Sequence, residues 1–301
     1  MMRSLYSAIS GLKNHQIKMD VIGNNIANVN TTGFKRSRVS FATALSQTMK
    51  GASSPTPAAG PLYTLGGTNP MQVGLGAMLG SIDQIMTPGS AQTTGNPTDM
   101  MIQGAGFFVL NNSGQTVYSR AGGFSLDSAG NLADPATGAL VQGHMFTSDA
   151  DVTLNPLPMP ADNVNISKIA TKNTDATGAG PLQNYSIDQS GIVTGIYTNA
   201  GVTTTHKIAQ IAVANFANAP GLESVGGSFY RNSNNSGAAV IGVAGTNGSG
   251  IIIPSAIEMS NVDLANEFTD MIVAQRGFQA NGRVITVSDT LLQELIDLKR
   301  Q

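Results

Sequence analysis

The residues that most often carry chemistry are few in this chain and lie far apart in it. Its three histidines are His15, His144 and His206, and none has a second histidine or a carboxylate at metal-ligand spacing. The chain has no cysteine, which excludes disulfides, thiolate metal sites and cysteine nucleophiles. We therefore expect no metal, no cofactor and no catalytic centre.

Two glycine pairs and two aspartates are the remaining candidates for chemistry. Neither Gly74-Leu75-Gly76 nor Gly104-Ala105-Gly106 completes a dinucleotide fingerprint or leads into a P-loop lysine. We interpret both as glycines of tight β turns. Asp127 and Asp188 each come shortly before a turn glycine, where an aspartate caps the turn with its own side chain. We favour this structural role over a carboxylate pair.

The two ends of the chain differ in charge from its middle and from each other. The 301 residues have a net charge of −2, which gives no bias towards nucleic acid. Residues 1–44 contain a single acid and the bases Arg3, Lys13, Lys18, Lys35, Arg36 and Arg38. Residues 258–301 contain fewer bases than acids, the acids being Glu258, Asp263, Glu267, Asp270, Asp289, Glu294 and Asp297. Segments of opposite charge are suited to pair with each other or with neighbouring copies, which indicates assembly rather than catalysis.

Apolar residues on alternating steps of three and four predict a helix at each end. In residues 3–28 the stripe is Leu5, Ile9, Leu12, Met19 and Ile26. In residues 261–299 it includes Leu264, Phe268, Met271, Phe278, Ile285 and Leu292. Ser260-Asn261-Val262-Asp263 fits a capping box for the second helix. At 1.5 Å per residue that helix extends roughly 55–60 Å, so its stripe must be covered by the first helix or by another chain. We expect these eleven residues to form interfaces between subunits.

Four amides on or beside these helices are candidates for polar contacts. Asn24, Asn25, Asn28 and Gln275 could hydrogen-bond between subunits and set their register, as buried amides do in coiled coils. Local capping explains them equally well, and both interpretations stay open.

Between the helices the pattern changes to short β runs separated by glycines, which indicates an all-β domain. We therefore expect an α+β protein in which long N- and C-terminal helices pair as a coiled coil around a mainly β middle domain of short strands and hairpins. The expected parts are a terminal-helix domain (1–45 plus 258–301), a linker or extended connection (46–70), a mainly β outer domain (71–145 plus 185–257) and a reduced insertion or small subdomain (146–184).

Three long motifs, in this order, resemble the bacterial flagellar axial proteins of the rod and hook family. They are MDVIGNNIANVNTTGFK at 19–35, GAGFFV at 104–109 with YSRAG at 118–122, and SNVDL at 260–264 with AQRGFQAN at 274–281. Matching segments cover all but about 46–67 and 146–184. Within the family, 262–268 and 295–300 resemble the hook subunits most, and the distal rod subunit is the close alternative. The chain is short for a hook subunit, which implies that the outer insertion is reduced.

The resemblance implies a structural subunit of the flagellar hook, a flexible helical tube that transmits motor torque as a universal joint. It implies terminal helices in an inner tube and a β domain in the outer wall. The implied partners are many copies of the chain itself, the distal rod protein, the hook cap protein, the hook–filament junction protein and the flagellar type III export apparatus. No nucleic acid or small-molecule substrate is implied.

The implied location is extracellular, in the hook and basal body, after export without a cleaved signal peptide. A secreted β-domain adhesin or enzyme is the alternative from a different class. It would need a clustered polar site or a conventional export signal, and the sequence shows neither.

Overall fold

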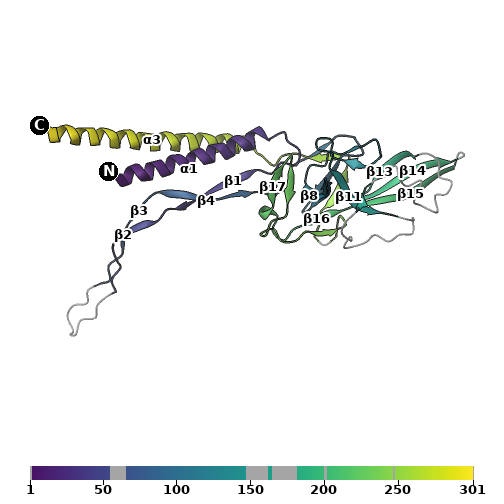
Figure 1. Ribbon diagram of the computed structural model, residues 1–301, viewed down its shortest axis with the longest axis horizontal. Helices are drawn as coiled ribbons and strands as arrows, with labels where there is room; N and C mark the ends of the chain where they lie inside the picture. The colour runs from purple at the N-terminus through teal and green to yellow at the C-terminus, as the bar shows by residue number, and fades with distance from the viewer. Residues whose placement is uncertain are drawn as a thin grey trace. The chain divides into compact units, whose positions relative to one another are not determined.

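The computed structural model describes residues 2–54, 66–146, 162–164, 182–199, 202–246 and 248–300. The chain divides into two compact units, both drawn in Figure 1. The first, here called the helical unit, comprises Met1–Ala27, Ser37–Asp83 and Asp263–Gln301. The second, here called the β unit, comprises Asn28–Arg36 and Gln84–Val262.

The helical unit contains the two helices that the apolar spacing predicts. Helix α1 spans Met2–Ala27 and α3 spans Leu264–Arg300, and the two lie side by side in Figure 1. The start of α3 differs from the expected capping box. Asp263 is the N-cap residue, because its Oδ1 accepts from the backbone N–H of Ala265 at 3.0 Å. Ser260 Oγ instead accepts from the N–H of Val262, in the turn before the helix.

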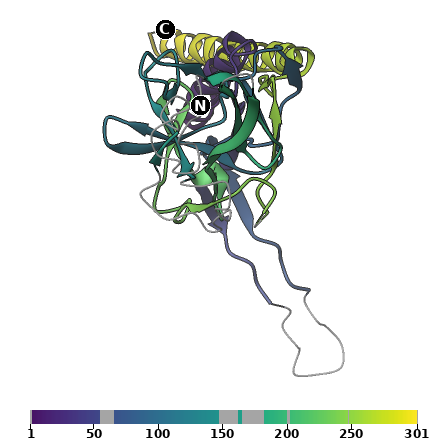
Figure 2. The ribbon, with the colours of Figure 1, turned by 90° about the vertical axis from the view of Figure 1, so that its right-hand side faces the viewer.

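Four strands of the helical unit form a narrow antiparallel arm. Strand β1 (Ser37–Thr43) pairs with β4 (Ala77–Gln84), and β2 (Ser46–Lys50) pairs with β3 (Met71–Gly74). Every described residue of β2 and β3 is exposed. Part of the expected connection at 46–70 is therefore a paired strand, which Figures 1 and 2 show leading away from β1 and β4.

Among its described residues, the β unit holds the remaining strands and one short 3-10 helix. In chain order they are β5 (Ala91–Thr93), β6 (Met100–Gln103), β7 (Phe107–Asn112), β8 (Gln115–Ser119), β9 (Ser125–Leu126), β10 (Leu132–Ala133), β11 (Leu140–Met145), β12 (Asp162–Asn163), β13 (Leu182–Ile187), β14 (Ile192–Asn199), β15 (Val202–Ile211), β16 (Val213–Asn215), η2 (Ala219–Gly221), β17 (Glu223–Gly226), β18 (Phe229–Arg231), β19 (Val240–Gly242), β20 (Ile251–Pro254) and β21 (Ala256–Glu258). The main sheet runs in the order β13-β14-β15-β11-β7-β8-β18-β17.

Strand β7 lies near the middle of that sheet and is buried on both faces. Phe108 and Leu110 pack into one apolar cluster with Ile208 and Ile211 of β15. Phe107 and Val109 alternate with them and therefore face the second cluster on the opposite side. The strand consequently reads as a continuous apolar run rather than as an alternating one.

The two aspartate turns are confirmed as a matched pair. Asp127 Oδ1 accepts from the N–H of Ala129 and Asn131, and the Asp188 carboxylate accepts from Gln189 and Ser190. In both turns the glycine three residues on has φ 79° and donates its N–H to the aspartate carbonyl. These aspartates therefore shape hairpin turns, as the sequence predicts.

The α+β class with a mainly β middle is confirmed, whereas coiled-coil pairing of the helices and the domain boundaries stay predictions. The division into units places 71–83 with the helices, where the sequence expectation counted it with the β domain. The expected insertion at 146–184 lies almost wholly outside the described residues. Among the described residues, neither helix is apolar enough over its length to cross a membrane.

Candidate functional site

The face of α1 that contacts α3 includes the small residue Gly11 and the polar residues His15 and Lys18. A Cβ at Gly11 would lie 2.6 Å from Asn281 Nδ2, and one at Gly277 would lie 2.5 Å from His15 Cε1. Lys18 Nζ pairs with Asp270 Oδ1 at 2.9 Å. Because the α3 numbers fall as the α1 numbers rise, the two helices run antiparallel. Small residues therefore allow close approach along this seam, and one exposed ion pair adds little to it.

The predicted apolar stripe of α1 does not coincide with the residues that contact α3. Its members are all half-buried: Leu5, Ile9, Leu12, Met19 and Ile26. The two fully buried apolar residues of α1, Ala8 and Ile22, instead continue the three- and four-residue spacing of Gly11, His15 and Lys18. The pattern thus predicted the helix correctly, while the role of the stripe between subunits stays a prediction.

On α3 the predicted stripe is only partly covered. Met271, Ile285 and Leu292 are half-buried, whereas Leu264, Phe268 and Phe278 are exposed. A second set of exposed apolar residues, here called the outer stripe, is Val273, Val284, Val287, Leu291, Leu295 and Leu298. From Val284 onward it follows steps of three and four, and Val273 lies about three turns earlier on the same face of the helix. Such a continuous uncovered apolar face marks an interaction surface rather than a solvated one.

The four expected polar contacts separate into different roles. Asn25 is buried: its Nδ2 donates to Ser37 O at 2.9 Å and to Glu267 Oε2 at 3.2 Å. Asn28 Oδ1 accepts from Thr31 Oγ1 at 3.0 Å, which is a local cap. Asn24 and Gln275 are exposed. Asn25 therefore ties α1 to β1 and α3 within one chain, and contacts of these amides between subunits stay a prediction.

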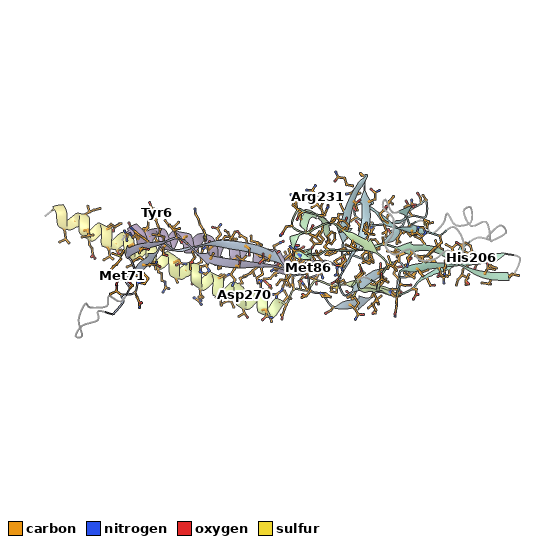
Figure 3. All side chains as sticks on the ribbon, turned by 90° about the horizontal axis from the view of Figure 1, so that it is seen from below. Tyr6, Met71, Met86, His206, Arg231 and Asp270 are labelled. Atoms are coloured by element: carbon orange, nitrogen blue, oxygen red, sulfur yellow. The ribbon has the colours of Figure 1, made fainter. Side chains whose placement is uncertain are left out.

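The other candidates for chemistry stay apart. His15 lies on α1, His144 on β11 and His206 on β15, where Figure 3 labels it. In the part of the chain that the structure describes, no three side chains of the metal-ligating types come together. Tyr6 and Asp270 project from α1 and α3, and Met71 from the arm (Figure 3).

The β unit contains a buried ion cluster that the sequence did not reveal. Lys35 Nζ lies 2.5 Å from Glu258 Oε1, and Arg120 Nη1 lies 3.3 Å from Glu258 Oε2. The side chains of Lys35 and Glu258 are fully buried and that of Arg120 is 3% exposed. Here these three residues are called the ion cluster. Two cations thus share one carboxylate away from water, and each depends on it.

Backbone groups add further hydrogen bonds to the ion cluster. Lys35 Nζ also donates to Thr87 O at 2.9 Å, and Glu258 Oε1 accepts from the N–H of Gly89 at 2.9 Å. Arg120 donates to the carbonyls of residues 102 and 104, and its guanidinium lies 5.2 Å from the centre of the Phe107 ring. Burial lowers the pKa of Lys35 below its ordinary value, and the charge of Glu258 opposes this shift. The carboxylate is therefore the group that favours the charged form of the buried ammonium.

Gly33 lets two backbones meet beside the ion cluster. Its φ is 67°, and a Cβ there would lie 2.5 Å from Ala121 N. We expect Gly33→Ala to lower the free energy of unfolding by about 2–4 kcal/mol, through backbone strain and the clash together. Gly95 is a matched control, because its φ is 73° and nothing lies within 4 Å of its Cβ position. Gly95→Ala should cost only about 1–2 kcal/mol of strain in the same urea titration. Equal losses for the two variants would contradict a packing role for Gly33.

Tyr230 gives the β unit a pH dependence in the alkaline range. Burial raises the pKa of the Tyr230 hydroxyl to about 12, and its ring packs edge-on against Phe107. A folded-state pKa above the unfolded one stabilises the fold at low pH and stops doing so as pH rises from 10 towards 12. The full loss is about 3 kcal/mol, at 1.36 kcal/mol per unit, and about 2 kcal/mol of it falls between pH 9 and 11.5. Urea unfolding of the wild type and Tyr230→Phe at pH 9 and 11.5 measures it, and equal losses in both proteins would contradict the assignment.

The uncovered apolar faces of α3 are of the kind found in chains that associate with other protein surfaces. Three family models match the chain in order. They are the flagella basal body rod protein (residues 5–35), the flagellar hook protein FlgE/F/G D1 domain (101–195) and the flagellar basal body rod FlgEFG protein C-terminal region (253–298). Each model contains one member of the ion cluster.

Full-length relatives agree with these models. The chain is 45% identical over 301 residues to the flagellar basal-body rod protein FlgG of Bacillus subtilis, with both chains covered completely. It is 31% identical over 472 residues to the flagellar hook protein FlgE of Treponema pallidum, again with both covered completely. It is 33% identical over 450 residues to FlgE of Borreliella burgdorferi, with 99% of this chain and all of the relative covered. The chain belongs to the flagellar rod and hook axial protein family, whose members named here are structural proteins rather than enzymes.

Proposed function

We propose that this chain is a subunit of the flagellar rod, and specifically of its distal part. The observation that carries the proposal is the 45% identity to a FlgG protein over 301 residues, the full length of both chains. The hook relatives need alignments of 450 and 472 residues and are less identical. They therefore contain long segments without a counterpart in this chain. The rod alternative is thus better supported than the hook function that the motifs first suggested.

In this proposal the chain polymerises through its terminal helices. The outer stripe of α3 and the eleven residues expected at interfaces are apolar, and several of them are uncovered in the single chain. Burying them against neighbouring copies provides the main driving force, at about 25 cal/mol per Å² of apolar surface. In this proposal the exposed amides Asn24 and Gln275 contribute polar contacts that fix the register.

The proposed partners follow from a rod location. The polymer consists of many copies of this chain joined to other axial subunits of the basal body. In this proposal the subunit reaches the rod through the flagellar type III export apparatus. Contacts with the hook cap protein and the hook–filament junction protein belong to the hook alternative.

Complementation in Bacillus subtilis tests the assignment. Expressed in a strain that lacks FlgG, the chain should restore complete rods, seen by electron microscopy of isolated basal bodies, together with swimming. Expressed in a strain that lacks its hook protein, it should restore neither hooks nor swimming. The opposite result would establish the hook function. As a second measurement, purified protein under salting-out conditions should form straight tubes, whereas curved tubes would contradict the rod assignment.

A further inference from the structure

Residues 256–261, here called the strap, connect three separate parts of the β unit. Strand β21 (Ala256–Glu258) pairs with β5, and the N–H of Met259 continues this pairing to Ser90 O at 2.9 Å. The carbonyl of Glu258 accepts from the N–H of Gly33 at 2.8 Å. The strap therefore holds both the segment before β5 and the segment that follows α1.

Asn261, the last residue of the strap, also hydrogen-bonds to separate segments of the β unit. Its Oδ1 accepts from the N–H of Arg36 at 2.8 Å, and its Nδ2 donates to the carbonyls of Ile85 and Thr87 at 2.8 and 3.2 Å. These backbone groups belong to segments that lie far apart in the chain. Without the strap they would be left without these hydrogen bonds, which costs about 1–3 kcal/mol for each group that stays buried.

Because of the charges of the ion cluster, the β unit can bury Lys35 and Arg120 at low cost only when the strap is in place. Lys35 and Arg120 are both cations, both are buried, and Glu258 of the strap is the carboxylate that faces them. Burial lowers the pKa of both cations, and Glu258 acts in the opposite direction on each. Closing the β unit before Glu258 arrives would bury two like charges without a counter-ion, which is strongly unfavourable.

The order of the three residues in the chain determines which of them is available first when the chain is delivered from one end. Glu258 follows Lys35 by 223 residues and Arg120 by 138 residues. A chain delivered from its N-terminus therefore presents both cations, and almost all strands of the β unit, before the carboxylate. We propose that the strap is a folding gate, in which the main sheet of the β unit reaches its protected state only when residues 256–261 dock.

The gate operates within a single chain and needs no partner molecule. Its benefit rests on the proposed function, because a subunit exported through a narrow channel must stay unfolded until its C-terminal part has left the channel. Refolding in solution requires neither export nor assembly, so its outcome is independent of the rod assignment.

Pulsed hydrogen exchange with mass spectrometry during refolding of the full-length chain from urea tests the gate. In the wild type, amides of β7, β8 and β11 should gain protection together with those of β5 and β21, with rates within about twofold. Sheet amides that become protected about tenfold or more faster than the strap would overturn the proposal.

A charge-free cluster separates the electrostatic cause from simple packing. In Lys35→Met/Arg120→Met/Glu258→Gln, no cation has to be matched, and replacing a buried ion network by groups of similar volume is often tolerated. In this variant the amides of the main sheet should become protected at least about tenfold faster than those of the strap. Simultaneous protection in this variant would overturn the charge mechanism. A control variant, Glu223→Gln, alters an exposed pair with Arg231 and should refold like the wild type.

Discussion

Replacing Glu258 with glutamine is expected to lower the free energy of unfolding of the β unit by about 3–5 kcal/mol. The change keeps the size of the side chain and removes its charge. Lys35 and Arg120 then stay buried without a counter-ion. Native domains are stable by only about 5–15 kcal/mol, so the variant approaches the limit of folding. Urea unfolding at pH 7, followed by circular dichroism of the β signal, measures the loss.

The same substitution at an exposed glutamate provides the control. Glu223 pairs with Arg231 at 2.9 Å, but the two side chains are 59% and 49% exposed. Water and salt screen such a pair, so Glu223→Gln should change the free energy of unfolding by less than about 1 kcal/mol. If the two glutamine variants lose the same stability, the ion cluster contributes no more than a surface pair and its assigned role is wrong.

Much of the fold could be predicted from the sequence, because helices and turns are encoded in neighbouring residues. The stripe of α3 repeats every three to four residues, and Asp127 and Asp188 act on groups one to four residues away. The N-cap at Asp263 was misplaced by three residues, since Ser260 presents the same local pattern. Local signals of this kind establish that an element exists better than they establish where it begins.

The ion cluster could not be predicted, because nothing local marks it. Lys35 and Glu258 belong to end segments of opposite charge, and that sign difference indicated attraction but not which residues meet. Arg120 lies in the charge-poor middle of the chain, where few other charged residues could pair with it. A lone buried arginine needs a partner, and only the tertiary fold brings Glu258 to it across 138 residues.

The seam between α1 and α3 escaped prediction for a different physical reason. Spacing of large apolar residues identifies the face with the most to bury, which need not be the face that meets the nearest helix. Here the contact uses Gly11 and Gly277, whose missing side chains allow close approach. The larger apolar residues of the outer stripe are left uncovered, and it is on them that assembly depends in the proposed function.

Charging the outer stripe near the end of α3 should therefore abolish polymerisation while leaving the single chain folded. Leu295 and Leu298 are 50% and 70% exposed, and they lie beyond the stretch of α3 that contacts Gly11 and His15. Figure 1 shows this end of α3 extending past the N-terminus of α1. The proposed assembly buries these two leucines, and their loss removes about 3–6 kcal/mol from each contact between subunits. Leu295→Asp/Leu298→Asp should therefore raise the critical concentration at least about 100-fold.

The matched control adds the same two charges to the same turns of α3 but away from the outer stripe. Thr290 and Gln293 are exposed polar residues, so Thr290→Asp/Gln293→Asp should assemble at close to the wild-type concentration. Sedimentation and electron microscopy under salting-out conditions measure both variants, and circular dichroism checks that each monomer keeps its fold. Because the control carries equal net charge, a difference between the variants isolates the apolar face from general repulsion. Tubes from the leucine variant at the wild-type concentration would show that subunits do not meet through the end of α3.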